Sequence, residues 1–216
     1  RDLHYPLRRQ RQMCISDRLK YKGNIVTTYY YSTSCGKTTT MKAWGTSENE
    51  SNGYLQSVEV KDKNGDYEKS LPWYRWEADI DQDILSTLLA ENVKKNIGTV
   101  QSLEVTKTGP GGVALQIKAV GDKGSITVDT ENKIRKALGG NGYEIKKQDG
   151  TVAQSGTLLP SAFFKVKKAG NIFKIIGGGY GHGIGMSQNG ANEMAKKGKN
   201  YQEILQMFYP GTTIEK

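Results

Sequence analysis

Alternation of hydrophobic and polar residues predicts β-strands over much of this chain. The stretches VQSLEVTK (100–107) and VALQIKAV (113–120) flank the connection TGPGG, which predicts an antiparallel hairpin. Residues 163–179 predict a second pair of strands. Other strand candidates are runs rich in β-branched and aromatic residues near glycine turns: two strands within 14–36 joined at Lys22-Gly23-Asn24, then 53–60 and 73–80 around the turn Asn64-Gly65, then 125–129 and a hairpin over 143–157.

Helical spacing of apolar residues appears in four shorter segments. Asp81 is placed to cap a helix over 82–92, and Thr130 is placed to cap a helix over 131–138 that ends at Gly139. Ser187 precedes a further helix that stops at Gly198, and Asn200 with Glu203 forms a capping-box pattern before the last one. The chain is therefore predicted to be α+β, with a mostly antiparallel β-sheet or barrel-like core and a few short helices, two of them at the C-terminus.

The composition divides the chain into a basic leader, residues 1–18, and one domain, residues 19–216. Residues 1–23 hold seven basic and two acidic residues, so +5 of the formal net charge of +9 lies there. The rest of the chain uses scattered lysine, whereas phosphate recognition favours arginine. A solvated surface is thus favoured over a nucleic-acid interface, with a weak attraction to an anionic polymer such as a cell wall left open.

The sequence predicts no membrane segment, metal site or cofactor. No apolar run approaches the length of a membrane-spanning helix, and a secretion signal would have to lie upstream of Arg1. Cys14 and Cys35 are too few for a disulfide scaffold or a closed metal site; one optional disulfide and two unpaired thiols are both compatible with the sequence.

The candidate chemistry is concentrated in GGGYGHGIGMSQNGA (177–191), which contains seven glycines around His182. Its spacing fits neither a phosphate-binding Walker loop nor a dinucleotide fingerprint, so nucleotide binding is disfavoured. Two alternatives remain for His182: a ring bonded to a backbone carbonyl inside a tight turn, or an imidazole left accessible by glycines that carry no side chains. The residues alone indicate a polar binding loop.

This block and a second segment carry a family resemblance. Residues 177–216 resemble the C-terminal signature of the stage II sporulation protein D / LytB family, with a GHG-x-GMSQ-x-GA core and a closing YPGT. Residues 21–45 resemble the family's strand followed by the small-residue turn S-T-S-C-G and a tryptophan, and 137–150 and 158–164 also fit. The resemblance covers about residues 19–216.

The resemblance implies a domain that acts on peptidoglycan. Members resemble lytic transglycosylases, in which one carboxylic acid cleaves glycan strands between N-acetylmuramic acid and N-acetylglucosamine and leaves a 1,6-anhydro end. The family's segment with the catalytic glutamate is not found within residues 1–23. Glu59, Glu77, Glu193 and Glu203 do not match its motif, so the catalytic residue stays unknown and enzymatic activity stays open.

The resemblance and the polar chemistry together predict a glycan-binding groove between the two segments. Neutral hydroxyl, amide and imidazole groups suit sugar hydroxyls and acetamides, and Tyr29, Tyr31, Trp44 and Tyr180 offer faces for stacking, with strand packing as the alternative for the tyrosines. The predicted substrate-binding residues are Ser32, Thr33, Ser34, Cys35, Tyr180, His182, Gly183, Ser187 and Gln188.

Three functions follow for testing. The first is an extracytoplasmic peptidoglycan-acting domain, held at the cell wall or membrane through an upstream segment, with glycan strands as substrate and other wall hydrolases or sporulation proteins as further partners. The second is a non-catalytic wall-binding or amidase-enhancer module. The third and weakest is a nucleic-acid binder, suggested by charge alone.

Overall fold

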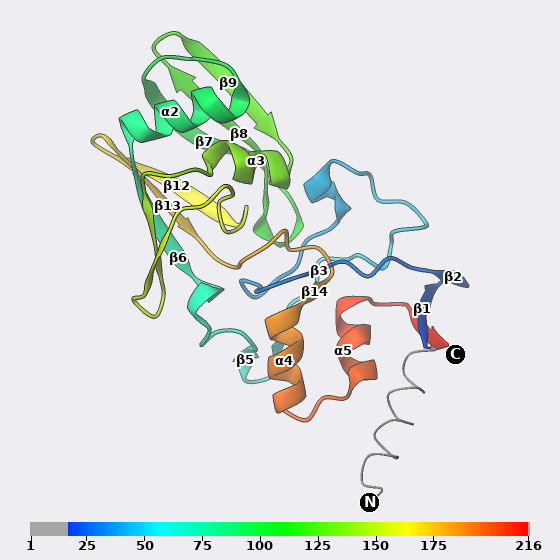
Figure 1. Cartoon of the computed structure of the whole chain (residues 1–216). Coiled ribbons are helices and arrows are strands. Elements are labelled where there is room, and N and C mark those ends of the chain that lie inside the picture. The colour runs from blue at the N-terminus through cyan, green and yellow to red at the C-terminus, as the bar shows by residue number, and fades with distance from the viewer. Residues whose placement is uncertain (1–16, 216) are drawn as a thin grey trace, which may run out of the picture.

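The computed structural model describes residues 17–215 and confirms an α+β fold with several antiparallel sheets (Figure 1). The largest sheet has the strand order β11-β10-β6-β13-β12, and a three-stranded sheet has the order β7-β8-β9. These sheets stay open, so the described residues do not form the barrel-like arrangement that the strand pattern allowed. The strands are β6 (Trp76–Asp81), β7 (Val100–Thr108), β8 (Ala114–Gly121), β9 (Gly124–Asp129), β10 (Glu144–Lys147), β11 (Val152–Gln154), β12 (Phe164–Ala169) and β13 (Ile172–Gly177).

The remaining strands are short and lie with the C-terminal helices at the other end of the molecule (Figure 1). They are β1 (Arg18–Tyr21), β2 (Asn24–Ile25), β3 (Tyr30–Tyr31), β4 (Lys61–Asp62), β5 (Gly65–Asp66), β14 (Met186–Ser187) and β15 (Thr213–Glu215). Strand β1 pairs with both β2 and β15, so Arg18 lies opposite Glu215, near the C-terminus. The two ends of the described chain therefore meet.

The helices lie where the sequence predicts them. They are α2 (Gln82–Val93), α3 (Glu131–Leu138), α4 (Gln188–Lys196) and α5 (Tyr201–Phe208), with 3-10 turns η1 (Met41–Trp44), η2 (Pro72–Tyr74) and η3 (Pro110–Gly112). Asp81 caps α2, Ser187 caps α4, and Asn200 forms the predicted capping box with Glu203. Thr130 stands at the N-cap of α3 but its side chain makes no capping bond, because the backbone there adopts φ 70°.

The predicted hairpins over 100–120, 143–157 and 163–179 are confirmed, whereas the strand predicted over 53–60 is wrong. Only Glu59 in that stretch makes a β-bridge, to Lys37. The stretch starts in a turn instead, in which the Leu55 N–H donates to the Asn52 carbonyl oxygen at 3.0 Å. The strand predicted over 73–80 likewise begins only at Trp76, after η2.

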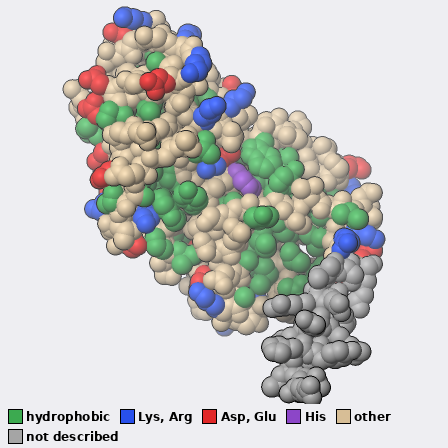
Figure 2. Space-filling view, in the orientation of Figure 1, with side chains coloured by type: hydrophobic (Ala, Val, Ile, Leu, Met, Phe, Trp, Pro, Cys, Tyr) green, Lys and Arg blue, Asp and Glu red, His purple; other side chains and the backbone are tan. Residues whose placement is uncertain are grey.

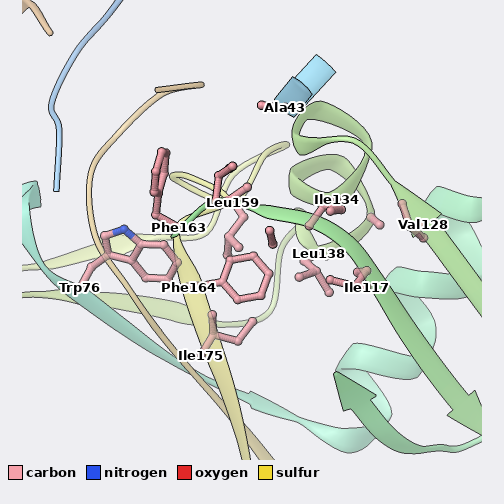
Figure 3. Packing of buried hydrophobic residues seen from close by; sticks show 14 of the residues in the cluster. Ala43, Trp76, Ile117, Val128, Ile134, Leu138, Leu159, Phe163, Phe164 and Ile175 are labelled. Atoms are coloured by element: carbon pink, nitrogen blue, oxygen red, sulfur yellow. The ribbon is translucent and has the colours of Figure 1, made fainter. Parts of the chain in front are cut away.

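The hydrophobic core joins the large sheet to the β7–β9 sheet and α3 (Figure 3). Trp76 is almost fully buried and its indole N–H donates to the carbonyl oxygen of Gly179 at 3.0 Å. The core therefore fixes the start of the glycine-rich loop directly. The same core cluster contains Ile117, Ile134, Leu138, Leu159, Phe163, Phe164 and Ile175.

Substitutions at Asn200 and Thr130 test whether the N-cap side-chain bond contributes to stability. Asn200→Ala removes a side chain that accepts from the Glu203 N–H at 2.9 Å, so we expect a loss of about 1 kcal/mol in the free energy of unfolding. Thr130→Ala is the matched control at an N-cap without a capping bond, and it should change that free energy by less than about 0.5 kcal/mol. Urea unfolding of the two variants measures both values, and equal losses would contradict the assignment.

Candidate functional site

The two motif segments lie directly side by side. Thr33 and Tyr180 form an antiparallel bridge, with N–H to carbonyl distances of 3.0 and 2.8 Å. Strand β14 pairs in parallel with β3, placing Met186 opposite Tyr30 and Ser187 opposite Tyr31. We expected the two turns to face each other across a groove. They are instead hydrogen-bonded neighbours, because the serine turn (residues 32–36) continues β3 and the glycine block (residues 177–191) runs along it.

The glycines of the block permit this close approach. A Cβ on Gly178 would lie 2.8 Å from the Cβ of Cys35, and a Cβ on Gly181 would lie 2.6 Å from that of Tyr31. Real Cβ atoms do not come this close, so the serine turn fits only against residues without side chains. Tight packing of two backbones thus explains the glycine content better than exposure of the imidazole does.

A buried carboxylate joins the two segments, and sequence reasoning did not identify it. Glu68 follows β5 and is fully buried. One carboxylate oxygen accepts from the Ser34 N–H at 2.9 Å and from the Ser187 hydroxyl at 2.7 Å, and the other accepts from the Ser34 hydroxyl. Ser187 is also the N-cap of α4, whose Gly190 N–H donates to it at 3.3 Å. Glu68 therefore fastens the serine turn to the start of a helix.

Burial is the main influence on the charge of Glu68. Removal from water raises the pKa of this carboxyl above its ordinary value of 4.5, while the bonds from Ser34 and Ser187 act in the opposite direction. A carboxyl group that contacts no solvent, and whose oxygens accept hydrogen bonds from the protein, is suited to holding neighbouring chain segments in position. We therefore assign Glu68 to holding the site together.

His182 is bonded to the main chain through both ring nitrogens. The Ile184 N–H donates to Nδ1 at 3.1 Å, so Nε2 carries the proton and donates to the Tyr30 carbonyl oxygen at 3.0 Å. Its ring lies 5.1 Å from the Trp44 ring and 5.5 Å from the Tyr31 ring, measured between centroids. Burial lowers the pKa of His182 to about 4, so the imidazole is neutral.

The edge of the ring nonetheless reaches the surface. Figure 2 shows the imidazole in a hollow of the visible face, beside hydrophobic side chains. The Trp44 indole N–H donates to Glu131 at 3.3 Å, and Glu131 forms a buried ion pair with Arg135 at 2.7 Å. Helix α3 thus holds Trp44 in place against His182.

The predicted site residues differ widely in exposure. Tyr180 and Gln188 are exposed, and Ser32, Cys35 and His182 are half-buried. The others are buried: Thr33, Ser34, Gly183 and Ser187. The hydroxyl groups of Ser34 and Ser187 donate to Glu68. The predicted site residues that remain available to a ligand are therefore the exposed and half-buried ones.

A groove of about 1130 Å³ opens beside the serine turn. Of the predicted site residues, Cys35 lines it, and burial raises the pKa of that thiol. The floor includes Phe163, Phe164 and Ile176, which come from β12, β13 and the preceding loop. Its rim carries both signs of charge: Lys37, Lys61, Arg75 and Lys165 with Glu59, Asp66 and Glu104.

The carboxylates considered as alternative acids are paired with lysines. Glu59 contacts Lys37 at 3.1 Å and also pairs with Lys61, and Glu77 lies 3.4 Å from Lys174. Glu193 and Glu203 form helix pairs with Lys196 and Lys199 at 2.7 and 2.6 Å. Within residues 17–215, no three His, Cys, Asp or Glu side chains gather as a metal site requires. No helix of this range has the length and apolar character needed to cross a bilayer.

Comparison with known proteins identifies the family. Residues 40–185 match a family described as Domain of unknown function (DUF8618). Stage II sporulation protein D of Bacillus subtilis (strain 168) is 30% identical over 196 residues, covering 91% of this chain and 47% of that protein. The Amidase enhancer of the same organism is 50% identical over 58 residues, covering 27% of this chain and 8% of that protein. An uncharacterized protein of Brachyspira hyodysenteriae is 40% identical over 95 residues, covering 43% of this chain and 26% of that protein.

The chain belongs to the DUF8618 family and, through these relatives, to the stage II sporulation protein D family. It matches less than half the length of each of these relatives. The match to stage II sporulation protein D covers nearly the whole chain, so it takes in the serine turn, Glu68 and the glycine block together.

The pH dependence of the unfolding free energy tests whether burial raises the pKa of Glu68. The folded state holds the Glu68 proton more tightly than the unfolded chain, so the stability that this group adds is complete below about pH 4.5 and is lost as the pH rises through the raised pKa. Glu68→Gln removes this term. We expect the stability of the native chain relative to the variant to fall as the pH rises above about 4.5, as measured by urea unfolding.

Glu203→Gln provides a control of opposite sign. Lys199 and the Asn200 N–H lower the pKa of the exposed Glu203, so any stability it adds is present above about pH 4.5 and is lost as the pH falls. If the difference in unfolding free energy between the native chain and Glu68→Gln does not change with pH, the raised pKa of Glu68 is contradicted.

The hydrogen bonds of His182 predict a fixed neutral tautomer. Because the pKa lies near 4, the ring should stay neutral with its proton on Nε2 from pH 5 to pH 8. Stability from this neutral ring is present above pH 6.5 and is lost as the pH falls towards 4. Nitrogen chemical shifts of a ¹⁵N-histidine-labelled sample report the tautomer, and a His182 titration midpoint near 6.5 would contradict it.

Proposed function

We propose that this chain is a peptidoglycan-acting domain of the stage II sporulation protein D type that holds a glycan strand. The observation that carries the proposal is the hydrogen-bonded unit made by the serine turn and the glycine block, next to a groove of about 1130 Å³. The exposed hydroxyl, amide and aromatic groups of this unit suit a hydroxyl-rich polymer such as a glycan strand. A wall location outside the cytoplasm is part of the proposal.

The reaction proposed for the whole protein is glycan cleavage between N-acetylmuramic acid and N-acetylglucosamine, with a 1,6-anhydro product. Such a reaction needs one acid that protonates the leaving oxygen and then accepts the proton of the sugar's own hydroxyl. Glu68 is enclosed and bonded to two serines, and we do not assign that role to it. In this proposal, residues 17–215 position the glycan, and the catalytic acid stays unknown.

A non-catalytic wall-binding module is the second candidate function. A relative carries the name Amidase enhancer, and its identity of 50% is the highest among the relatives described above. The lysine pairs of Glu59, Glu77, Glu193 and Glu203 also favour binding over acid catalysis at those positions. Other wall hydrolases or sporulation proteins are the partners that this candidate implies.

One incubation with purified peptidoglycan separates the two candidates. If the chain cleaves glycan, mass spectrometry of the soluble fraction should show new 1,6-anhydro ends, including from strands stripped of stem peptides. If it only binds, the chain should sediment with insoluble wall and release no such product. If the chain neither sediments with the wall nor releases product, the proposal is overturned. Strong, salt-dependent DNA binding that survives deletion of residues 1–18 would instead favour the nucleic-acid alternative.

A further inference from the structure

Three neighbouring strands of the large sheet, β10, β6 and β13, bring two aromatic rings and a lysine together at one end of the sheet. Strand β6 begins at Trp76, which lies opposite both Gly177 at the end of β13 and Lys147 at the end of β10. Three residues beyond this register, in opposite chain directions, stand Trp73 and Tyr180. Their ring centroids are 4.8 Å apart, and the ammonium of Lys147 lies 5.1 Å from the centroid of Trp73.

Both rings are held by the main chain around them. The Gly179 N–H donates to the Trp73 carbonyl oxygen at 2.8 Å, and Tyr180 is bonded to Thr33 through its own N–H and carbonyl oxygen. On the other side, the Gln148 side-chain amide donates to the carbonyl oxygen of Leu71 at 2.7 Å, just before η2. A ligand that contacts these rings therefore finds a preformed surface and does not have to order it.

The rings remain open to solvent although they lie beside a packed core. The Tyr180 side chain is 43% exposed and Trp73 is half-buried. The two ring planes are inclined by 54°, so the rings touch without covering each other's faces. An open aromatic face next to a cation provides an apolar contact surface together with a charge partner.

Trp73, Tyr180 and Lys147 are called the platform; they do not line the groove themselves, but residues close to them in the chain do. Arg75 lines the groove two residues after Trp73, and Gly178 lines it two residues before Tyr180. The platform therefore lies close to the groove along the chain, and we assign both to the same ligand.

We propose that Tyr180 and Trp73 form a stacking subsite for one pyranose ring of the glycan, with Lys147 pairing with a carboxylate on that sugar. The assignment rests on the proposed function above. The apolar C–H face of a pyranose matches an aromatic ring, and the ammonium beside it favours an acidic sugar such as N-acetylmuramic acid over a neutral one. Lys147 thus adds a cation that favours an acidic sugar, and Trp73 adds a second aromatic ring. Sequence reasoning included neither residue.

Calorimetric titration of the full chain with two soluble oligosaccharides tests the subsite. The probes are glycan strands that contain N-acetylmuramic acid and are freed of their peptides, and an N-acetylglucosamine oligomer of equal length. We expect Tyr180→Ala to weaken binding of the acidic strand about fivefold to tenfold, whereas Tyr180→Phe, which keeps the ring, should change it less than about twofold. Lys147→Gln should reduce the preference for the acidic strand and leave binding of the neutral oligomer unchanged.

Tyr201→Ala is the matched control, because Tyr201 is similarly exposed, at 46%, but lies on α5. Thermal unfolding of every variant checks that the fold is intact. If the native chain binds and Tyr180→Ala binds equally well, the subsite is overturned while the proposed function stands. If Tyr180→Phe loses as much affinity as Tyr180→Ala, stacking is wrong and the hydroxyl is the contact. If the native chain binds neither probe nor wall, the proposed function fails and the subsite fails with it.

Discussion

The structure depends on a carboxylate that is sealed from water between two chain segments far apart in sequence. Glu68 reaches back 34 positions to Ser34 and forward 119 positions to Ser187. An enclosed acid is tolerated only where its oxygens are fully bonded, so both serines must stay in place for Glu68 to be buried. The serine turn, helix α4 and the loop after β5 consequently form one unit. This bond set adds buried side-chain bonds to the main-chain bridge of Thr33 with Tyr180 and to the pairing of β3 with β14.

The imidazole and the glycines serve the same unit in other ways. His182 bonds the glycine block to β3 through the Tyr30 carbonyl oxygen, while its other ring nitrogen accepts from the Ile184 N–H within the block. The glycines let the two backbones approach each other closely. Each feature looks like a reactive site in the sequence and behaves as a fastening in the fold. The surfaces left for a ligand are therefore the rims of this unit: the groove beside Cys35 and the aromatic edge at Tyr180.

Local patterns predicted most of the secondary structure correctly. Hairpin turns, Asp81, Ser187 and the Asn200–Glu203 box act within a few residues, so the sequence displays them directly. Thr130 shows the limit, because its residue type suits a cap but its backbone conformation does not. Glu68 shows a second limit: in DYEKS it resembles a solvated charge, and only the tertiary fold encloses it. Tyr180 was a predicted site residue and Trp73 was not, because only the folded arrangement, in which β6 pairs with β13, brings the two rings into contact.

The pairing of β1 with β15 has a consequence for how this domain connects to anything else. Arg18 and Glu215 are register partners, and Lys20 forms an ion pair with Glu215 at 2.6 Å. A polypeptide attached at either end leaves the domain from a single corner, on the side of α5 and away from the β7–β9 sheet (Figure 1). The domain can thus be inserted into a loop of a host protein, or circularly permuted by a short linker, without pulling its strands apart.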